Sequence, residues 1–183
     1  SSLDLHHDQT FETFSLRKGE KLPAEQVRSL EDAFKAAQVF AENPEGWLML
    51  GGSYGVGKTH LAAAIANHLH SQGHPVTFVS VPDLLDHLRS TFSPASTVSY
   101  DRRFNQIRNA PLLVLDDLGT EAMTPWVREK LYQLFGYRFD AKLPTIITSA
   151  STPDKIDPRI RAWTDRELCV RKLITAPSYR GAR

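Results

Sequence analysis

Residues 52–59 constrain the possible folds of this chain more than any other stretch. They read Gly-Ser-Tyr-Gly-Val-Gly-Lys-Thr and fit the phosphate-binding pattern G-x-x-x-x-G-K-[ST] at every fixed position. Residues 47–50 before them predict a short buried strand, and residues 60–70 after them predict a helix. This order aims backbone N–H groups and the positive end of a helix dipole at one point. We therefore predict that the loop binds phosphate groups.

The loop also contains the side chains that a nucleotide site needs. Lys58 is predicted to reach the outer phosphates, and the Thr59 hydroxyl is predicted to hold Mg²⁺. A glycine-rich turn formed by chance would require neither residue. The candidate nucleotide-binding residues are Gly52, Ser53, Tyr54, Gly55, Val56, Gly57, Lys58, Thr59 and His60.

Length and composition are those of one ordinary globular domain. The 183 residues are 41% hydrophobic and 23% charged, and the formal net charge is +1. Contacts with nucleic acid would therefore need local basic patches. The single cysteine, Cys169, excludes an internal disulfide. No apolar run is long enough to cross a bilayer, and the first residues lack a secretory-signal pattern, so we expect a cytoplasmic protein without membrane contacts.

Apolar periodicity predicts strands that alternate with helices. Residues 1–22 show no clear period and are interpreted as an extended lead-in, and a helix is predicted from Pro23 to Phe40. Further strands are predicted at 76–79, 111–115, 145–148 and 168–174, and further helices at 83–92, 100–108 and around 127–135. This alternation predicts a three-layer α/β domain at 23–183, with helices on both faces of a mostly parallel, five-stranded sheet.

Two consecutive acids follow the third predicted strand. Asp116 and Asp117 come directly after the apolar run 111–115, where P-loop proteins place the acid that holds magnesium. We assign Asp116 to Mg²⁺, usually through water, and Asp117 to polarising the water that attacks the phosphate. On its own, Asp-Asp-Leu-Gly is equally typical of a solvated turn after a strand. The complete glycine loop in the same chain favours the magnesium interpretation.

Three stretches together resemble a known family. Residues 57–62, 112–121 and 144–149 resemble the AAA+ ATPases of the bacterial replicative-helicase loader family, of the DnaC and DnaI type, with the IstB transposition helper as a near relative. The likeness runs from about Phe11 to Arg180 and implies an AAA+ P-loop core without a separate N-terminal helicase-binding domain. It further implies ATP and Mg²⁺ as cofactors. The implied partners are a hexameric replicative helicase, single-stranded DNA and further copies of the chain.

The resemblance also assigns a sensor to the end of the fourth strand. Relatives typically have Thr-Ser-Asn there, whereas this chain has Thr148, Ser149 and Ala150. Ser149 and Ala150 are therefore the predicted sensor positions, and a hydroxyl of Ser149 or Ser151 is the alternative donor to phosphate. Because the asparagine amide is missing, we expect ATP to bind while hydrolysis is slow.

Family members present an arginine to the nucleotide of a neighbouring subunit. The matching segment is 157–163, where Arg161 is the first candidate and Arg159 the second. Such a finger acting in trans accelerates other P-loop systems by roughly 10³ to 10⁵. The alternative is that both arginines form surface salt bridges.

A helical insertion between the second and third strands faces single-stranded DNA in the family. From Arg89 to Arg108, within this interval, the chain has four arginines against Asp101, with Tyr100 and Phe104 as possible stacking faces. The alternative is a solvated helix whose Phe104 and Ile107 lie in the core. The candidate DNA-binding residues are Arg89, Arg102, Arg103 and Arg108.

Several functions share these motifs. Helicase loading is the leading interpretation, and an IstB-like transposition helper and an ATP-dependent binding switch with little hydrolysis are the alternatives. A P-loop nucleotide kinase would share the glycine loop, but the consecutive acids followed by a Thr-Ser strand end fit it poorly.

Overall fold

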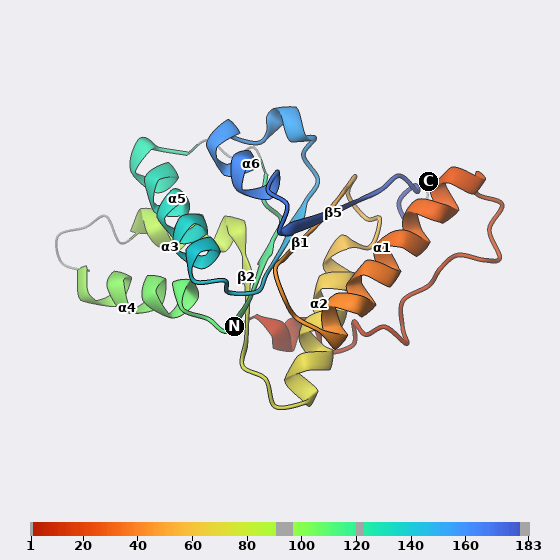
Figure 1. Ribbon diagram of the computed structural model, residues 1–183, viewed down its shortest axis with the longest axis horizontal. Helices are drawn as coiled ribbons and strands as arrows, with labels where there is room; N and C mark the ends of the chain where they lie inside the picture. Colours follow the sequence, from red (N-terminus) through yellow and green to blue (C-terminus); the bar gives the residue numbers. More distant parts are fainter. Residues whose placement is uncertain (1, 91–96, 120–122, 180–183) are drawn as a thin grey trace.

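The five predicted strands form one sheet in a computed structural model that describes residues 2–90, 97–119 and 123–179, with the side chains of 97–101 outside this description (Figure 1). Every strand pair is parallel, and the order across the sheet is β2-β3-β4-β1-β5. The strands are β1 (Trp47–Gly52), β2 (Val76–Ser80), β3 (Leu112–Asp116), β4 (Thr145–Ser149) and β5 (Cys169–Ile174). The predicted five-stranded sheet is thus confirmed.

Helices cover both faces of this sheet, as Figure 1 shows. The helices are α1 (Ala24–Glu42), α2 (Lys58–Ser71), α3 (Val81–Ser90), α4 (Thr97–Arg108), α5 (Pro125–Asp140) and α6 (Pro158–Thr164). Alternate residues of β1 enter two separate hydrophobic clusters. Leu48 and Leu50 pack with α1 and α2, whereas Trp47 and Met49 pack with the helices α3 to α6. Because strands buried on both faces need apolar residues throughout, the continuous apolar runs are explained.

Two segments differ from their prediction. Residues 1–22 are not simply extended: a 3₁₀ helix spans Leu3–His6, and the side chains of Leu3 and Phe14 are buried in the cluster with α1 and α2. Their apolar side chains follow no period because the segment is irregular, so the pattern concealed their burial. The short helix α6 was not predicted, and the carboxylate of Asp157 caps it by accepting from the N–H groups of Arg159 and Ile160.

Candidate nucleotide-binding site

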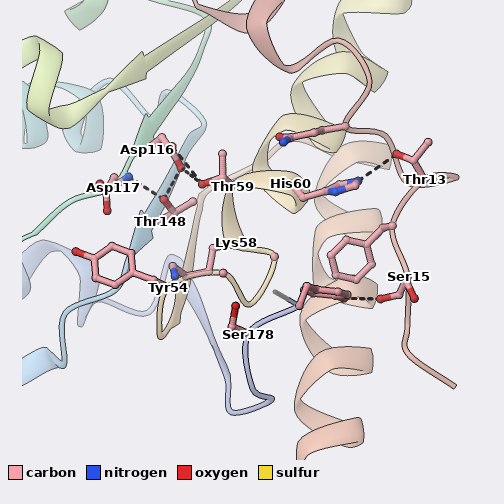
Figure 2. A pocket seen from close by; sticks show the side chains of 15 residues that line it. Thr13, Ser15, Tyr54, Lys58, Thr59, His60, Asp116, Asp117, Thr148 and Ser178 are labelled. Atoms are coloured by element: carbon pink, nitrogen blue, oxygen red, sulfur yellow. Dashed lines mark hydrogen bonds between the residues drawn. The ribbon is translucent and has the colours of Figure 1, made fainter. Parts of the chain in front are cut away.

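A cavity of about 660 Å³ lies at the carboxyl ends of the strands, beside the first turn of α2 (Figure 2). This is the edge at which parallel α/β sheets bind ligands. Most of the residues predicted to bind nucleotide or metal meet there, but Gly52, Ser53 and Val56 do not line the cavity. The lining residues are Gln9, Thr13, Phe14, Ser15, Tyr54, Gly55, Gly57, Lys58, Thr59, His60, Asp116, Asp117, Thr148, Ser178 and Tyr179.

The glycine loop has a conformation that only glycine adopts without strain at its key positions. Gly55 has φ 77° and Gly57 has φ 101°, both in the left-handed region. A Cβ atom at Gly57 would lie 2.8 Å from the Phe14 ring, so the loop also passes close to the N-terminal segment. Val56 is fully buried and anchors the loop in the core. Its side chain therefore has a structural role, and the phosphate contact of its backbone N–H group stays a prediction.

Lys58 is a buried cation at the wall of the cavity. Its side chain is only 7% exposed, and its Nζ donates to the Ser53 carbonyl over 2.7 Å. Burial lowers the pKa of Lys58, and the negative charges of Asp117 and Asp116 oppose this shift. A phosphate in the cavity would supply the close negative charge that the ammonium otherwise lacks.

Two side chains from two different elements, α2 and β4, converge on the Asp116 carboxylate. The Thr59 hydroxyl donates to its two oxygens over 2.9 and 3.2 Å, and the Thr148 hydroxyl donates to Oδ1 over 2.6 Å (Figure 2). A carboxylate and a hydroxyl side by side are the oxygen ligands that Mg²⁺ prefers. The donor set of this chain therefore fits a magnesium ion. It lies next to the loop that is expected to hold phosphates.

Asp117 is held in a defined position beside this carboxylate. Its φ is 65°, which turns the chain sharply at the end of β3, and its backbone N–H donates to the Thr148 hydroxyl over 2.8 Å. Its half-buried side chain lines the cavity. Thr148 thus connects both acids, and it is the side chain of β4 that faces the site.

The predicted sensor positions are not those that the structure brings to the cavity. Ser149 is fully buried, donates to the Leu118 carbonyl and accepts from the N–H of Ser151 over 3.2 Å. Neither Ser149 nor Ala150 lines the cavity. Since successive strand residues point to opposite faces, Thr148 and Ser149 cannot both face the nucleotide. In this structure the Ser149 hydroxyl is therefore turned away from the cavity, and its role as the sensing hydroxyl stays a prediction.

The two candidate finger arginines lie outside the cavity of their own chain. The guanidinium of Arg159 stacks on the Tyr132 ring at 3.9 Å. Arg161 donates to the Pro153 carbonyl over 3.1 Å and forms an ion pair with Asp165 at 3.7 Å. Both arginines thus make contacts within their own chain, and Arg161 has the surface salt bridge that the alternative interpretation expects. Either one could contact only the nucleotide of another copy of the chain.

The candidate DNA-binding arginines are distributed over α3 and α4. Arg89 is exposed and pairs with Asp86 at 3.1 Å, and Arg102 and Arg103 are also exposed. Arg108 is half-buried, with its guanidinium over the Tyr137 ring at 4.6 Å.

The two aromatic residues proposed for base stacking have different outcomes. Phe104 is only 5% exposed and packs in the core together with Ile107, as the alternative interpretation expects, so it offers no face for base stacking. The side chain of Tyr100 lies outside the described residues.

Sequence reasoning missed two parts of the cavity wall. The N-terminal segment lines it with Gln9, Thr13, Phe14 and Ser15, and the tail lines it with residues 178–179, although no motif marks either part. His60 connects the loop to the first of these parts, because its Nε2 lies 2.8 Å from the Thr10 carbonyl and 3.2 Å from the Thr13 hydroxyl (Figure 2). Only contacts between distant segments create this wall.

A sequence model of the family described as IstB-like ATP binding protein matches residues 2–161. The chain belongs to this IstB-like family. The resemblance to AAA+ ATPases of the helicase loader type, with IstB as a relative, is thereby confirmed. None of the helices in the described ranges combines the length and apolar character that a bilayer-spanning helix requires.

The IstB-like chain is similar to several replication proteins. The replicative helicase loader DnaI of Bacillus subtilis (strain 168) is 34% identical over 110 residues, which are 60% of this chain and 34% of DnaI. The replicative helicase loader DnaC of Escherichia coli (strain K12) is 28% identical over 153 residues, which are 83% of this chain and 59% of DnaC. A crystal structure of DnaI matches at a TM-score of 0.74 and 27% identity, over 95% of this chain and 92% of that chain. The IstB-like chain therefore has the AAA+ P-loop fold, and it spans only part of the length of both loaders.

Proposed function

We propose that the chain is the ATPase core of a helicase loader, which binds ATP with Mg²⁺ and single-stranded DNA and helps to place a hexameric replicative helicase on DNA. The observation that carries this proposal is the convergence of Thr59 and Thr148 on the Asp116 carboxylate, beside the buried Lys58. The names of the similar proteins DnaI and DnaC, both replicative helicase loaders, support the choice of partner.

Each group of the cavity has a distinct task in this function. The glycine loop and Lys58 hold the phosphates, and Thr59 and Asp116 supply oxygen ligands for the metal. Mg²⁺, when bound, neutralises charge on the outer phosphates. Asp117 orients and polarises water, and the Thr148 hydroxyl holds Asp117 through its N–H group. Hydrolysis is slow because the hydroxyl of Thr148 already donates to Asp116, and neither Ser149 nor Ala150 lines the cavity.

The same proposal includes self-association. Neither Arg159 nor Arg161 lines the cavity of its own chain, so an arginine that completes the site comes from a neighbouring copy. Arg161 remains the first candidate, and it exchanges its contact with Asp165 for the nucleotide phosphate on assembly. Single-stranded DNA contacts the exposed arginines of α3 and α4, Arg89, Arg102 and Arg103, and this binding weakens steeply as salt rises.

The nucleotide part is tested with a fluorescent ATP analogue, titrated with Mg²⁺ and with EDTA. We expect the wild type to bind more tightly with Mg²⁺, and Asp116→Asn to lose this difference because it lacks a ligand charge. The matched control is Asp140→Asn, which changes an exposed acid at the end of α5. Equal Mg²⁺ dependence of wild type and Asp116→Asn would overturn the metal assignment. Binding without turnover in single-turnover assays would favour the binding switch.

The partner is tested by capture of purified proteins in the presence of ATP and Mg²⁺. We expect capture of a hexameric replicative helicase, and no capture by Lys58→Ala. The match to the IstB-like family model favours one other function, that of a transposition helper. Capture of a transposase in place of the helicase would decide for that function.

A further inference from the structure

The tail residues 178–179 and the N-terminal segment around Ser15 are joined by a hydrogen bond beside the glycine loop. The Tyr179 hydroxyl donates to the Ser15 carbonyl, and the Tyr179 backbone N–H donates to the Gly55 carbonyl over 2.9 Å. One tail residue therefore holds both the N-terminal segment and the phosphate-binding loop. Figure 2 shows Ser15 and Ser178 on the side of the cavity away from Asp116.

Arg17 makes the second half of this connection. Its guanidinium lies 4.6 Å from the centre of the Tyr179 ring and donates to the Pro177 carbonyl. It also forms a two-pronged ion pair with Glu20, in which Nη2 donates to Oε1 over 3.1 Å. The arginine is only 7% exposed, although its φ of 58° is unfavourable for a residue with a side chain. A buried arginine in a costly backbone conformation needs several contacts to hold it there. The ion pair with Glu20 is local, whereas the contacts with Pro177 and Tyr179 join the two ends of the chain.

The fastened segments leave little free space around the loop. A Cβ atom at Gly55 would collide with the Ser178 side chain, and one at Gly57 would lie 3.3 Å from the Tyr179 ring. The Phe14 and Tyr179 rings meet edge to face at 6.0 Å. Burial raises the pKa of Tyr179 to about 12, so its hydroxyl remains a donor at neutral pH.

We infer that Arg17 and Tyr179 are positioning residues, which clasp the tail onto the N-terminal segment and thereby hold a bound nucleotide in the cavity. Arg17 does not line the cavity, so it acts through Tyr179, Ser15 and the loop. The inference rests on the proposed nucleotide binding. Opening of the clasp then limits the rate at which nucleotide leaves, because two walls of the cavity separate only when these contacts break.

The test measures dissociation of a fluorescent ATP analogue by stopped-flow from wild type, Arg17→Ala, Tyr179→Phe and the double variant. We expect dissociation to be about tenfold faster for Arg17→Ala, which loses charge-assisted hydrogen bonds, and about threefold faster for Tyr179→Phe, which keeps the ring. The dissociation rate of the double variant should increase by less than the product of the two single-variant factors, because both residues act through one contact. Arg28→Ala, an exposed arginine on α1, is the matched control with wild-type rates.

Further readouts separate positioning from general stabilisation. In steady-state hydrolysis, Arg17→Ala should raise KM about tenfold while kcat changes less than twofold, and Arg17→Lys should recover part of this loss because it keeps the cation. Hydrogen exchange of the Tyr179 amide should speed up in Arg17→Ala, since this amide donates to Gly55. A dissociation rate unchanged in Arg17→Ala would overturn the clasp, as would multiplicative effects in the double variant.

Failure of the clasp and failure of the proposed function give different results. Wild-type protein that binds no nucleotide, or Lys58→Ala that binds as well as wild type, would overturn both proposals. The clasp alone would be overturned if wild type binds nucleotide, Lys58→Ala loses affinity as expected, and the nucleotide dissociation rates of the Arg17 and Tyr179 variants equal that of wild type. Should Arg17→Ala fail to fold, Tyr179→Phe decides the question, because it removes a single hydroxyl.

Discussion

Two buried cations lie at opposite ends of the sheet and are held in different ways. Lys58 is at the carboxyl ends of the strands, where its Nζ has one hydrogen bond, to the Ser53 carbonyl. Arg138 is at the amino ends, where it donates to Thr145 and to the carbonyls of four residues. Those four residues are Ile107, Arg108, Ala110 and Pro144. Neither cation has an ion pair within the described part of the chain.

The difference shows how one fold separates binding from scaffolding. Burial lowers the pKa of both side chains, and that of Arg138 falls to about 10, so Arg138 still carries its charge at neutral pH. The Thr145 hydroxyl and the carbonyls around Arg138 accept from all three of its guanidinium nitrogens and connect the end of α4 to the start of β4. Lys58 faces a cavity and keeps donors for a ligand. One charge is satisfied by the protein, and we propose that the other is satisfied by phosphate.

The largest effect is expected at Lys58. Lys58→Met should weaken binding of ATP with Mg²⁺ by at least about 100-fold, because the charge on the outer phosphates loses its nearest cation. The free energy of unfolding without nucleotide should not fall, since the change removes a buried charge. Equilibrium titration and urea denaturation measure the two quantities, with Lys35→Met on α1 as the exposed control. A loss of stability as large as the loss of affinity would contradict the comparison.

The opposite outcome is expected at Arg138. Arg138→Met should lower the free energy of unfolding by about 3 kcal/mol, because buried carbonyls lose their donor. Nucleotide affinity of the folded protein should stay within about threefold of wild type, since each tenfold change needs about 1.4 kcal/mol at the site. Urea denaturation gives the first value, and Arg28→Met is its exposed control. Wild-type stability in Arg138→Met would show that the two cations do not differ as described.

A pair of threonines on β4 sharpens the same contrast with smaller effects. Thr145 is fully buried and accepts from Arg138, whereas Thr148 is 1% exposed and contacts Asp116 and the N–H of Asp117. Thr145→Val should cost about 1–2 kcal/mol of stability and leave hydrolysis unchanged. Thr148→Val should slow hydrolysis about tenfold, because Asp116 and Asp117 lose their shared partner. The comparison fails if both variants lose only stability.

The smallest effect concerns pH. Because burial lowers the pKa of Lys58 in the folded protein, the unfolded chain binds more protons between that lowered value and its own value of about 10.4. Stability of the wild type should therefore rise relative to Lys58→Met as pH increases through this window, and be lost as pH falls through it. Urea denaturation of both proteins at several pH values measures the slope. Parallel stability curves would show that Lys58 is not desolvated.

Much of the fold follows from local patterns in the chain. The five strands and the helices α1 to α5 were predicted within a few residues, because buried strands need apolar runs and amphipathic helices need a three-to-four residue period. The short helix α6 was missed because seven residues give no measurable period. The lead-in 1–22 was interpreted as simply extended because its irregular backbone gives no period, although Leu3 and Phe14 are core residues.

The candidate site divides in a similar way. Loop residues Lys58 and Thr59 and the acids Asp116 and Asp117 were predicted as a group, since their types and spacing follow from phosphate and metal chemistry, and they line one cavity. Of the residues at the end of β4, it is Thr148 and not the predicted Ser149 whose hydroxyl contacts Asp116 at the cavity. A resemblance locates the end of a strand, but the face of each side chain depends on the register of the strand in the folded sheet.

The pattern of residues alone determined that a glycine loop follows a buried strand, opens a helix and shares the chain with two acids. Those features are local, because steric limits on the backbone and apolar periodicity act over a few residues. Only the tertiary structure decided that Thr148 joins both acids, that five neutral acceptors surround Arg138, and that Arg17 meets Pro177 across 160 positions of sequence. Such contacts depend on how packed elements bring distant segments together, and no local signal in the sequence specifies them.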